Sequence, residues 1–132
     1  VSVLRYRGKN TVIYTPAQFC EKFGISPMQY ADFKSLTGDT ADNVKGAEKV
    51  GKKTASQLIR KFGTLEAVLQ NAEQIEKPSV RRSITENAER LRLNYRLIKL
   101  DSTAKLPFAL KDLRFEGSGF TTTEVLRGIR LK

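Results

Sequence analysis

Apolar residues recur at helical spacing through most of the chain. The clearest stretch is residues 52–62, where the apolar positions have the period of an amphipathic helix: Ala55, Leu58, Ile59 and Phe62. Gly63 predicts the end of that helix, because glycine readily takes the left-handed conformation that follows a last helical turn. Thr64 then predicts the N-cap of a short helix that ends near residue 70.

Three further helices are predicted from their start signals. Thr15-Pro16-Ala17-Gln18 and Ser26-Pro27-Met28-Gln29 each combine a capping hydroxyl, a proline in the first turn and a glutamine three residues after the cap. We expect these helices to end near Gly24 and Gly38. Pro78 opens a third helical stretch to about residue 100, and its apolar pattern predicts a break near Asn87.

Extended structure is predicted only near the two ends. Residues 1–14 alternate and contain Gly8-Lys9-Asn10, which predicts a β-hairpin, and residues 106–115 are expected to contain an extended piece. Thr121 to Glu124 resembles one more capping box. The fold class that follows is mainly α, a helical domain that continues from the edge of a sheet.

The charge of the chain favours a polyanionic partner. Its 132 residues carry 24 Lys and Arg against 14 Asp and Glu, a net charge of +10 at pH 7. Each phosphate that such a protein neutralises releases condensed counterions, so nucleic acid is the expected ligand. A basic domain of another kind, including a ribosomal-type protein, is the alternative.

The sequence excludes some chemistry. It has no histidine and a single cysteine, Cys20, so zinc sites and histidine-based acid–base catalysis are not expected. Cys20 falls in an apolar-periodic helix, which predicts a buried structural thiol. No apolar run approaches 18 residues, and we expect a reducing, cytoplasmic location without a membrane span.

Asp39 and Asp42 are the candidate metal ligands. They stand three residues apart in a predicted loop, a spacing that lets both carboxylates meet one Mg²⁺ or Mn²⁺ ion. The alternative is that they cap a turn or the next helix. Two-metal phosphodiester cleavage draws on more carboxylates than two, and no other acidic residues cluster nearby.

The segment after these aspartates is the candidate DNA-binding element. We expect a helix-hairpin-helix: a short first helix around residues 42–45, a turn over residues 46–51 and the helix from Lys52. The bare amides of such a turn and the positive end of a helix favour an anion. The predicted DNA contacts here are Gly46, Lys49, Gly51, Lys52, Lys53 and Thr54. A tight helical connection without a ligand is the alternative.

Arg81 and Arg82 are predicted as further phosphate contacts, because they follow a proline-initiated helix start. Aromatic residues are not interleaved with the basic ones, and the chain has no tryptophan. This pattern favours grip on a duplex backbone over stacking on single-stranded bases.

The motifs resemble those of a known family. Residues 33–46, Phe-Lys-Ser-Leu-Thr-Gly-Asp-Thr-Ala-Asp-Asn-Val-Lys-Gly, followed by Val50-Gly51-Lys52-Lys53-Thr54-Ala55, are similar to the 5′-to-3′ exonuclease and flap-endonuclease family. Its members include the 5′-nuclease domain of bacterial DNA polymerase I and stand-alone relatives. The resemblance covers roughly residues 1–101, including Phe62 to Glu66, Lys77 to Arg81 and Asn94 to Leu100.

The resemblance implies a metal-dependent phosphodiesterase that acts on 5′ ends and flaps of DNA in replication and repair. Asp39 and Asp42 match carboxylates of the family's second metal. The turn matches a hairpin that grips duplex DNA, often with K⁺ on carbonyls that correspond to Ala47 and Val50. Lys49 stands where the family has glycine, so a positive φ there would strain the lysine.

The resemblance also implies a division of the chain. Residues 1–24 would be the hairpin and helix that end an α/β, PIN-like nuclease domain, 25–101 the helical domain with the hairpin motif, and 102–132 a C-terminal extension. The family's other carboxylates lie in an N-terminal portion that we expect outside this chain, which begins at Val1 without an initiator methionine.

The expected function is therefore the DNA-binding, metal-contributing C-terminal part of a bacterial, nucleoid-associated 5′ nuclease, acting as a monomer. The chain alone is expected to bind DNA weakly and cleave it poorly or not at all. A non-catalytic helix-hairpin-helix module, with the aspartates as turn caps, is the first alternative. A basic RNA-binding structural protein is the second.

Overall fold

The structure is a computed structural model that describes residues 3–7, 10–105 and 107–113. The chain separates into two compact units, residues 1–100 and 101–132. In the second unit the described residues form a short 3₁₀ helix, η3 (Leu110–Leu113), so the extended piece predicted over 106–115 is not found at residues 107–113. A helical turn forms there instead. The Asp112 N–H donates to the Ala109 carbonyl, and the Ala109 N–H donates to the Asp112 carboxylate. The capping box at Thr121 lies outside the described residues.

The first unit opens with an antiparallel hairpin of β1 (Val3–Arg7) and β2 (Asn10–Tyr14), in which Val3 pairs with Tyr14 and Arg7 with Asn10. The predicted strand pairing is confirmed. The turn at residues 8–9 lies outside the described residues. Helix α1 (Pro16–Phe23) follows and begins with the predicted capping box, in which Thr15 and Gln18 exchange hydrogen bonds.

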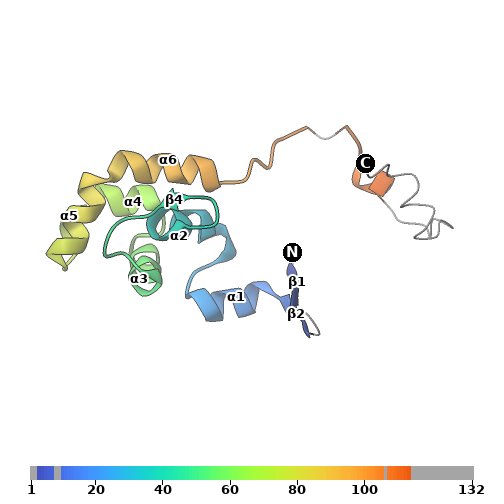
Figure 1. Cartoon of the computed structure of the whole chain (residues 1–132), viewed down its shortest axis with the longest axis horizontal. Coiled ribbons are helices and arrows are strands. Elements are labelled where there is room, and N and C mark those ends of the chain that lie inside the picture. Colours follow the sequence, from blue (N-terminus) through green and yellow to red (C-terminus); the bar gives the residue numbers. More distant parts are fainter. Residues whose placement is uncertain (1–2, 8–9, 106, 114–132) are drawn as a thin grey trace, which may run out of the picture. The chain divides into compact units, whose positions relative to one another are not determined.

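The helical body contains four longer helices, one shorter helix and two single 3₁₀ turns among the described residues (Figure 1). In chain order they are η1 (Pro27–Gln29), α2 (Tyr30–Thr37), α3 (Lys52–Phe62), α4 (Leu65–Gln70), η2 (Ala72–Gln74), α5 (Pro78–Glu86) and α6 (Ala88–Ile98). Their boundaries match the predicted ones closely, including Gly63 after α3, the Thr64 cap of α4 and the break at Asn87. The mainly helical fold is confirmed.

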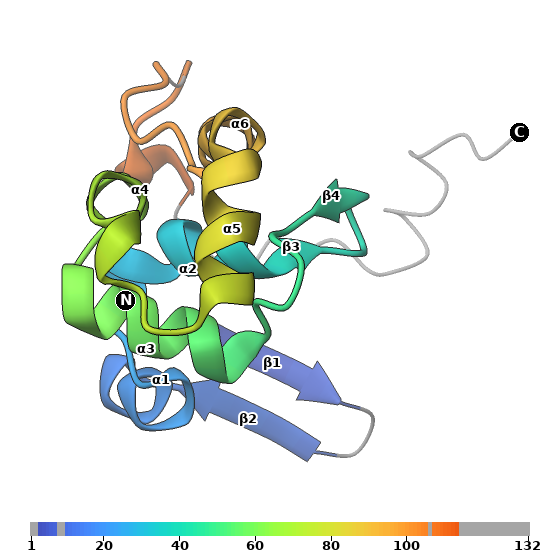
Figure 2. The same cartoon turned by 90° about the vertical axis from the view of Figure 1, so that its left-hand side faces the viewer.

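Helix α2 is the centre of this body. It packs against α3, α4 and α6, while α5 packs against η2 and α6 (Figure 2). The core side chains come from every one of these helices, and Phe33, Leu36, Ile59, Ile84 and Leu91 are almost fully buried. Burial of such apolar area is the main stabilising contribution of a small domain.

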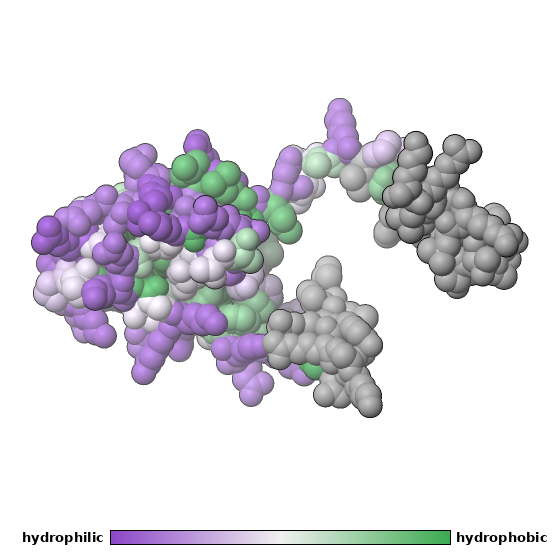
Figure 3. All heavy atoms as spheres, in the orientation of Figure 1, coloured by the Kyte–Doolittle hydropathy of each residue, from purple (hydrophilic) through white to green (hydrophobic). Residues whose placement is uncertain are grey.

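Polar and apolar side chains divide the surface. Hydrophilic residues cover most of the face in Figure 3 over α3 and α5, whereas apolar side chains gather along α6 and just after it: Leu93 and Leu97 on the helix and Leu100 beyond its end are exposed. None of the described helices combines the length and the apolar character that crossing a bilayer requires.

Two further sequence expectations are wrong in detail. Cys20 is exposed, because α1 turns Phe19 and Phe23 toward the aromatic cluster with Tyr30 and leaves the cysteine on its outer side. The short helix expected around residues 42–45 does not form. Gly38 and Asp39 (β3) instead pair with Val44 and Lys45 (β4), and Asn43 has φ +55°, which no α-helix accommodates. The helix before the turn is α2.

Candidate nucleic-acid interface

The turn between β4 and α3 has a fixed backbone. The Ala47 N–H donates to the Leu36 carbonyl at the end of α2 over 2.8 Å, and the Val50 N–H donates to the Ala47 carbonyl over 3.2 Å. The side chains of Ala47 and Val50 are buried in the core. The exposed residues between them, Glu48 and Lys49, therefore project from a turn that is anchored at both ends.

Lys49 adopts the left-handed conformation, with φ +63°. It is the third residue of the Ala47–Val50 β-turn, a position where a positive φ usually selects glycine. The positive φ that would strain a lysine at this position is therefore present. Such a conformation costs a non-glycine residue about 1 kcal/mol.

Gly38 and Gly46 bring two backbone segments into direct contact. A β-carbon at Gly46 would overlap the carbonyl oxygen of Leu36, and one at Gly38 would lie 2.5 Å from the amide nitrogen of Gly46. Gly38 also has φ +79°. Both glycines are therefore required by the fold, because no side chain fits between the end of α2 and the start of the turn.

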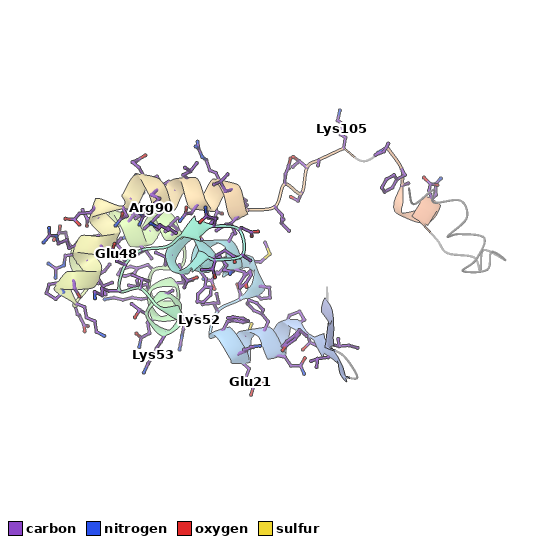
Figure 4. The ribbon with its side chains drawn as sticks, viewed as in Figure 1. Glu21, Glu48, Lys52, Lys53, Arg90 and Lys105 are labelled. Atoms are coloured by element: carbon purple, nitrogen blue, oxygen red, sulfur yellow. The ribbon has the colours of Figure 1, made fainter. Side chains whose placement is uncertain are left out.

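Gly51 has a different environment. It is the N-cap of α3, no side chain caps this helix, and nothing lies within 4 Å of the position that a β-carbon would take. The first amides of α3 therefore face outward without an intrahelical acceptor. Lys52 and Lys53 are exposed at the same end, as Figure 4 shows, and Thr54 is half-buried. An open, uncapped helix start flanked by lysines suits an anion such as phosphate.

Asp39 lies at the end of β3 and is fully engaged. Its Oδ2 accepts from the Lys34 ammonium over 2.8 Å, and its Oδ1 accepts from the Ala41 N–H over 3.3 Å. The Lys34 hydrogen bond is the main reason that the pKa of Asp39 lies below its usual value of 3.8. The carboxylate is therefore ionised at neutral pH, which is the state that a divalent cation requires.

Asp42 lies at the tip of the β3–β4 loop and is exposed. The Asn43 N–H donates to the Thr40 carbonyl across this loop, which closes it as a turn. No hydrogen bond or ion pair of the Asp42 carboxylate is found among the described residues. In the same part of the chain, no three acidic or sulfur side chains gather closely enough to hold a metal ion by themselves. The two aspartates thus offer hard oxygen donors for part of a site.

One groove joins the carboxylate and the start of α3. It has a volume of about 850 Å³ and is lined along its length by Asp39, Gly46, Gly51 and Lys52. Three further lysines line it: Lys22, Lys34 and Lys45. Lys34 is paired with Asp39, and the other three lysines leave the groove with a net positive charge that favours an anionic ligand.

The other predicted contacts lie elsewhere. Asp42, Lys49, Lys53 and Thr54 do not line the groove. Arg81 donates from Nε and Nη2 to the Ile75 carbonyl over 3.1 and 2.9 Å, so its guanidinium ties α5 to the chain after η2. Arg82 pairs with Glu86 on its own helix over 2.7 Å, and this exposed ion pair leaves it on the surface of α5.

Sequence reasoning missed the three lysines that complete the groove. Lys34 sits within α2, Lys22 within α1, and Lys45 looks like part of the loop, so no local pattern separates them from solvated surface charges. One signal was available. Lys34 lies near the end of α2, five residues before Asp39, and this short separation in sequence allows its ammonium to reach the Asp39 carboxylate.

Comparison with known proteins identifies the fold. Residues 25–120 match the family model described as 5′-3′ exonuclease, C-terminal SAM fold, which is most of the chain. The chain belongs to this family. The matched region contains every helix from η1 to α6. It also contains the residues that line the groove, other than Lys22 and Phe23 of α1.

Curated relatives of this 5′-3′ exonuclease fold include DNA polymerases I. The chain is 41% identical over 88 residues to the thermostable DNA polymerase I of Thermus aquaticus, and this match covers 67% of the chain and 10% of that protein. It is 35% identical over 104 residues to the DNA polymerase I of Bacillus caldotenax, covering 79% and 12%. The chain therefore spans about a tenth of the length of these relatives.

A solved structure shares the same fold. The bacteriophage T5 D15 flap endonuclease, in a pseudo-enzyme-product complex with DNA and metal ions, aligns with a TM-score of 0.63 and 23% identity. The match covers 72% of this chain and 35% of that one. The same T5 protein co-crystallised with metal ions aligns with a TM-score of 0.62. At this identity the likeness concerns the fold.

Proposed function

We propose that this chain is the DNA-holding C-terminal part of a metal-dependent 5′-3′ exonuclease or flap endonuclease. The observation that carries the proposal is that a single groove is lined both by Asp39 and by the uncapped start of α3, with Gly51 and Lys52. A nuclease must hold the phosphate backbone and present carboxylates to a metal beside it, and this groove offers both.

In this proposal Asp39 and Asp42 hold part of a Mg²⁺ or Mn²⁺ site. The fit rests on the donor set: Asp39 is ionised and part-exposed, with 25% of its side-chain surface accessible, and Asp42 is exposed. When bound, a divalent cation of this kind polarises a phosphodiester and stabilises charge on its oxygens. The remaining ligands would come from the part of the protein outside this chain, so the chain alone is expected to be a poor catalyst.

The chain's own residues hold the DNA. The amides at the start of α3 and the Lys52 ammonium would bind backbone phosphates, with Lys45 and Lys22 extending the contact along the groove. Lys49 and Lys53 would approach the same strand from the exposed side of the turn and helix. Contacts of this kind position DNA without reading its sequence. A 5′ end or flap of duplex DNA is the proposed substrate, in a cytoplasmic, monomeric protein.

Three finer parts of the proposal stay predictions. These are K⁺ at the carbonyls of Ala47 and Val50, phosphate contacts by Arg81 and Arg82, and the division of the chain at residues 24 and 101. The Ala47 carbonyl already accepts from the Val50 N–H and keeps its second lone pair for a cation.

A second function, a non-catalytic DNA-binding module, has one observation in its favour. Asp39 accepts from Ala41 two residues further on, as an aspartate that caps a turn does, and Lys34 neutralises its charge. In such a module the groove would bind DNA and the aspartates would only shape the loop. Metal dependence separates the two functions.

The deciding experiment measures binding and cleavage of an end-labelled 5′-flap duplex with Mn²⁺. In the full-length enzyme, Asp39→Ala is expected to lower turnover at least a hundredfold with DNA affinity within about twofold. Loss of affinity with normal turnover would contradict the metal assignment and favour the binding module.

The grip is tested in this chain by a charge-matched pair of variants. Lys52→Ala/Lys53→Ala removes two charges at the start of α3, and Arg60→Ala/Lys61→Ala removes two at its end. We expect the first to weaken binding and lower the slope of log K against log salt by about 0.9 per lost contact. The second is expected to leave the slope unchanged. Equal slopes for both would remove the helix start from the interface.

A further inference from the structure

The β3–β4 ladder that leads into the turn is too short to be stable by itself. It contains two residue pairs, Gly38 with Lys45 and Asp39 with Val44. An isolated two-stranded hairpin is marginal in water even when it is longer. The shape of the turn therefore depends on what packs behind it.

Helix α6 supplies that support through two side chains one turn apart. Arg90 Nη2 donates to the Gly46 carbonyl over 3.0 Å, and Asn94 Nδ2 donates to the Lys45 carbonyl over 2.8 Å. Asn94 Nδ2 also reaches the Ser35 carbonyl of α2 over 3.2 Å. Two side chains of α6 thus bind the consecutive carbonyls of Lys45, at the end of β4, and Gly46, at the start of the turn, and Asn94 also binds α2. The bonded residues are 44, 49 and 59 positions apart in the sequence.

The two side chains differ in burial: Asn94 is buried, whereas Arg90 is half-buried. Asn94 is only 4% exposed, so its amide has no access to bulk water and must find its partners within the protein. A buried amide or carbonyl left without a partner would destabilise the fold. The Lys45 carbonyl, which accepts from Asn94, is consequently held in one orientation.

Arg90 differs from its neighbour Arg92 in how its charge is used. Arg92 forms ion pairs with Glu66 and Glu89, whereas no carboxylate pairs with Arg90 among the residues that the structure describes. The Arg90 Nε is buried without a hydrogen-bond partner in that same part of the chain. Figure 4 marks Arg90 on α6 and Glu48 in the turn. In that part of the chain the hydrogen bond to the Gly46 carbonyl is the contact that holds the Arg90 guanidinium against the turn.

We propose that Arg90 and Asn94 are positioning residues for DNA binding, which hold the turn and the start of α3 in the geometry that receives phosphate. This inference rests on the proposed function of the groove. A turn that is rigid before DNA arrives loses less conformational freedom on binding, so the same phosphate contacts yield higher affinity. Neither residue needs to touch the DNA.

The first test needs no DNA. We compare backbone amide exchange in the wild-type chain, Arg90→Met and Asn94→Ala, with Arg96→Met as the matched control on the exposed side of α6. Exchange of the Ala47 and Val50 amides is expected to accelerate at least tenfold in the first two variants and not in the control. Exchange of the Val68 amide in α4 is expected to stay unchanged in all of them. Unchanged protection at Ala47 in a folded Arg90→Met variant would overturn the proposal.

The second test separates positioning from direct contact. We expect Arg90→Met to weaken binding of a 5′-flap duplex about fivefold to tenfold while the salt slope stays within about 0.3 of wild type. Arg90→Lys, which keeps the charge, should not restore the affinity fully, because lysine lacks the planar fork. A slope lower by about 0.9 with intact Ala47 protection would make Arg90 a phosphate ligand instead and overturn its positioning role.

The two failures are distinguishable. A wild-type chain that does not bind the duplex contradicts the proposed function, whereas the exchange experiment still decides whether α6 holds the turn. Far-ultraviolet circular dichroism and thermal unfolding establish that each variant is folded. If Arg90→Met does not fold, Arg90→Lys and Asn94→Ala provide the same exchange comparison.

Discussion

The ammonium of Lys34 lies 2.8 Å from the Oδ2 of Asp39, and both line the groove that leads to the start of α3. The side chain that would bind a metal is thus already neutralised by a neighbouring helix. A cation that approaches Asp39 must displace Lys34 or share the carboxylate with it. A displaced Lys34 ammonium would then be available to pair with a phosphate oxygen.

Replacing Lys34 is therefore expected to favour metal binding. We predict that Lys34→Met tightens Mn²⁺ binding to the chain about threefold to fivefold, since a part-exposed ion pair contributes up to about 1 kcal/mol. Electron paramagnetic resonance of free Mn²⁺ measures this directly. Asp39→Asn should abolish the effect, and Lys22→Met serves as the charge-matched control. Equal Mn²⁺ affinity in Lys34→Met and wild type would refute the competition.

The glycines of this region are expected to respond in opposite ways to alanine. Gly46→Ala should destabilise the chain by about 3 kcal/mol or more, because its β-carbon would overlap backbone atoms that cannot move aside. Gly51→Ala should change stability by less than about 1 kcal/mol, because its β-carbon meets no protein atom.

Gly51→Ala is nevertheless expected to weaken DNA binding. The Gly51→Ala methyl group would stand where a phosphate approaches the start of α3, so affinity should fall although the fold is intact. Urea unfolding and fluorescence anisotropy with a labelled flap duplex measure the two effects. A Gly51→Ala variant with wild-type affinity would mean that the DNA backbone does not approach this glycine.

Lys49→Gly is expected to relieve backbone strain. The strain at φ +63° costs about 1 kcal/mol and the entropy of glycine offsets most of it, so the substitution should stabilise the chain by no more than about 0.5 kcal/mol. Lys49→Ala should not stabilise it, because alanine keeps the strain, and this variant separates conformation from charge. Thermal unfolding gives the stability, and lower DNA affinity in both variants would identify the lysine as a phosphate contact.

The Glu66–Arg92 pair predicts a pH dependence away from the groove. Arg92 donates to both oxygens of Glu66 over 2.9 and 3.0 Å, and this hydrogen bonding holds the pKa of Glu66 below its usual value of 4.5. The native state therefore binds a proton at Glu66 less readily than the unfolded state. The resulting stability is present above pH 4.5 and is lost as the pH falls through the native pKa.

Nuclear magnetic resonance titration of the Glu66 carboxyl carbon tests this. In Arg92→Gln we expect the pKa to move up toward 4.5 and the acid sensitivity of unfolding to weaken. A Glu66 pKa that is the same in both proteins would show that the pair is not formed in solution.

Local signals were sufficient to predict the helices. Thr15 and Thr64 cap helices, Gly63 ends one and Asn87 interrupts one, and each acts through its own backbone or side chain within a few residues. Such short-range effects survive in any tertiary context. The candidate turn was found for the same reason, since Gly46, Gly51 and the lysines after them are contiguous.

Long-range relationships could not be predicted in this way. The segment 42–45 looked like a short helix because nothing local reveals that Gly38 and Gly46 must touch, which makes the loop a two-pair ladder. Cys20 looked buried because helical periodicity identifies an apolar face but not how much of it the rest of the chain covers. The role of Asn94 depends on Ser35 and Lys45, which are 59 and 49 positions away.

The hydrogen bonds that Arg90 and Asn94 donate have a consequence for transplanting the proposed DNA-binding element into another protein. The sequence from Gly38 to Thr54 looks like a self-contained cassette, yet its carbonyls are held by a helix that begins at Ala88. A graft of the loop and α3 into another scaffold would carry every lysine and glycine and still lose the shape that aligns them. The smallest portable unit therefore extends from α2 to the end of α6. A chain cut before Asn94 would keep the sequence of the motif but lose the hydrogen bond that Asn94 donates to its backbone.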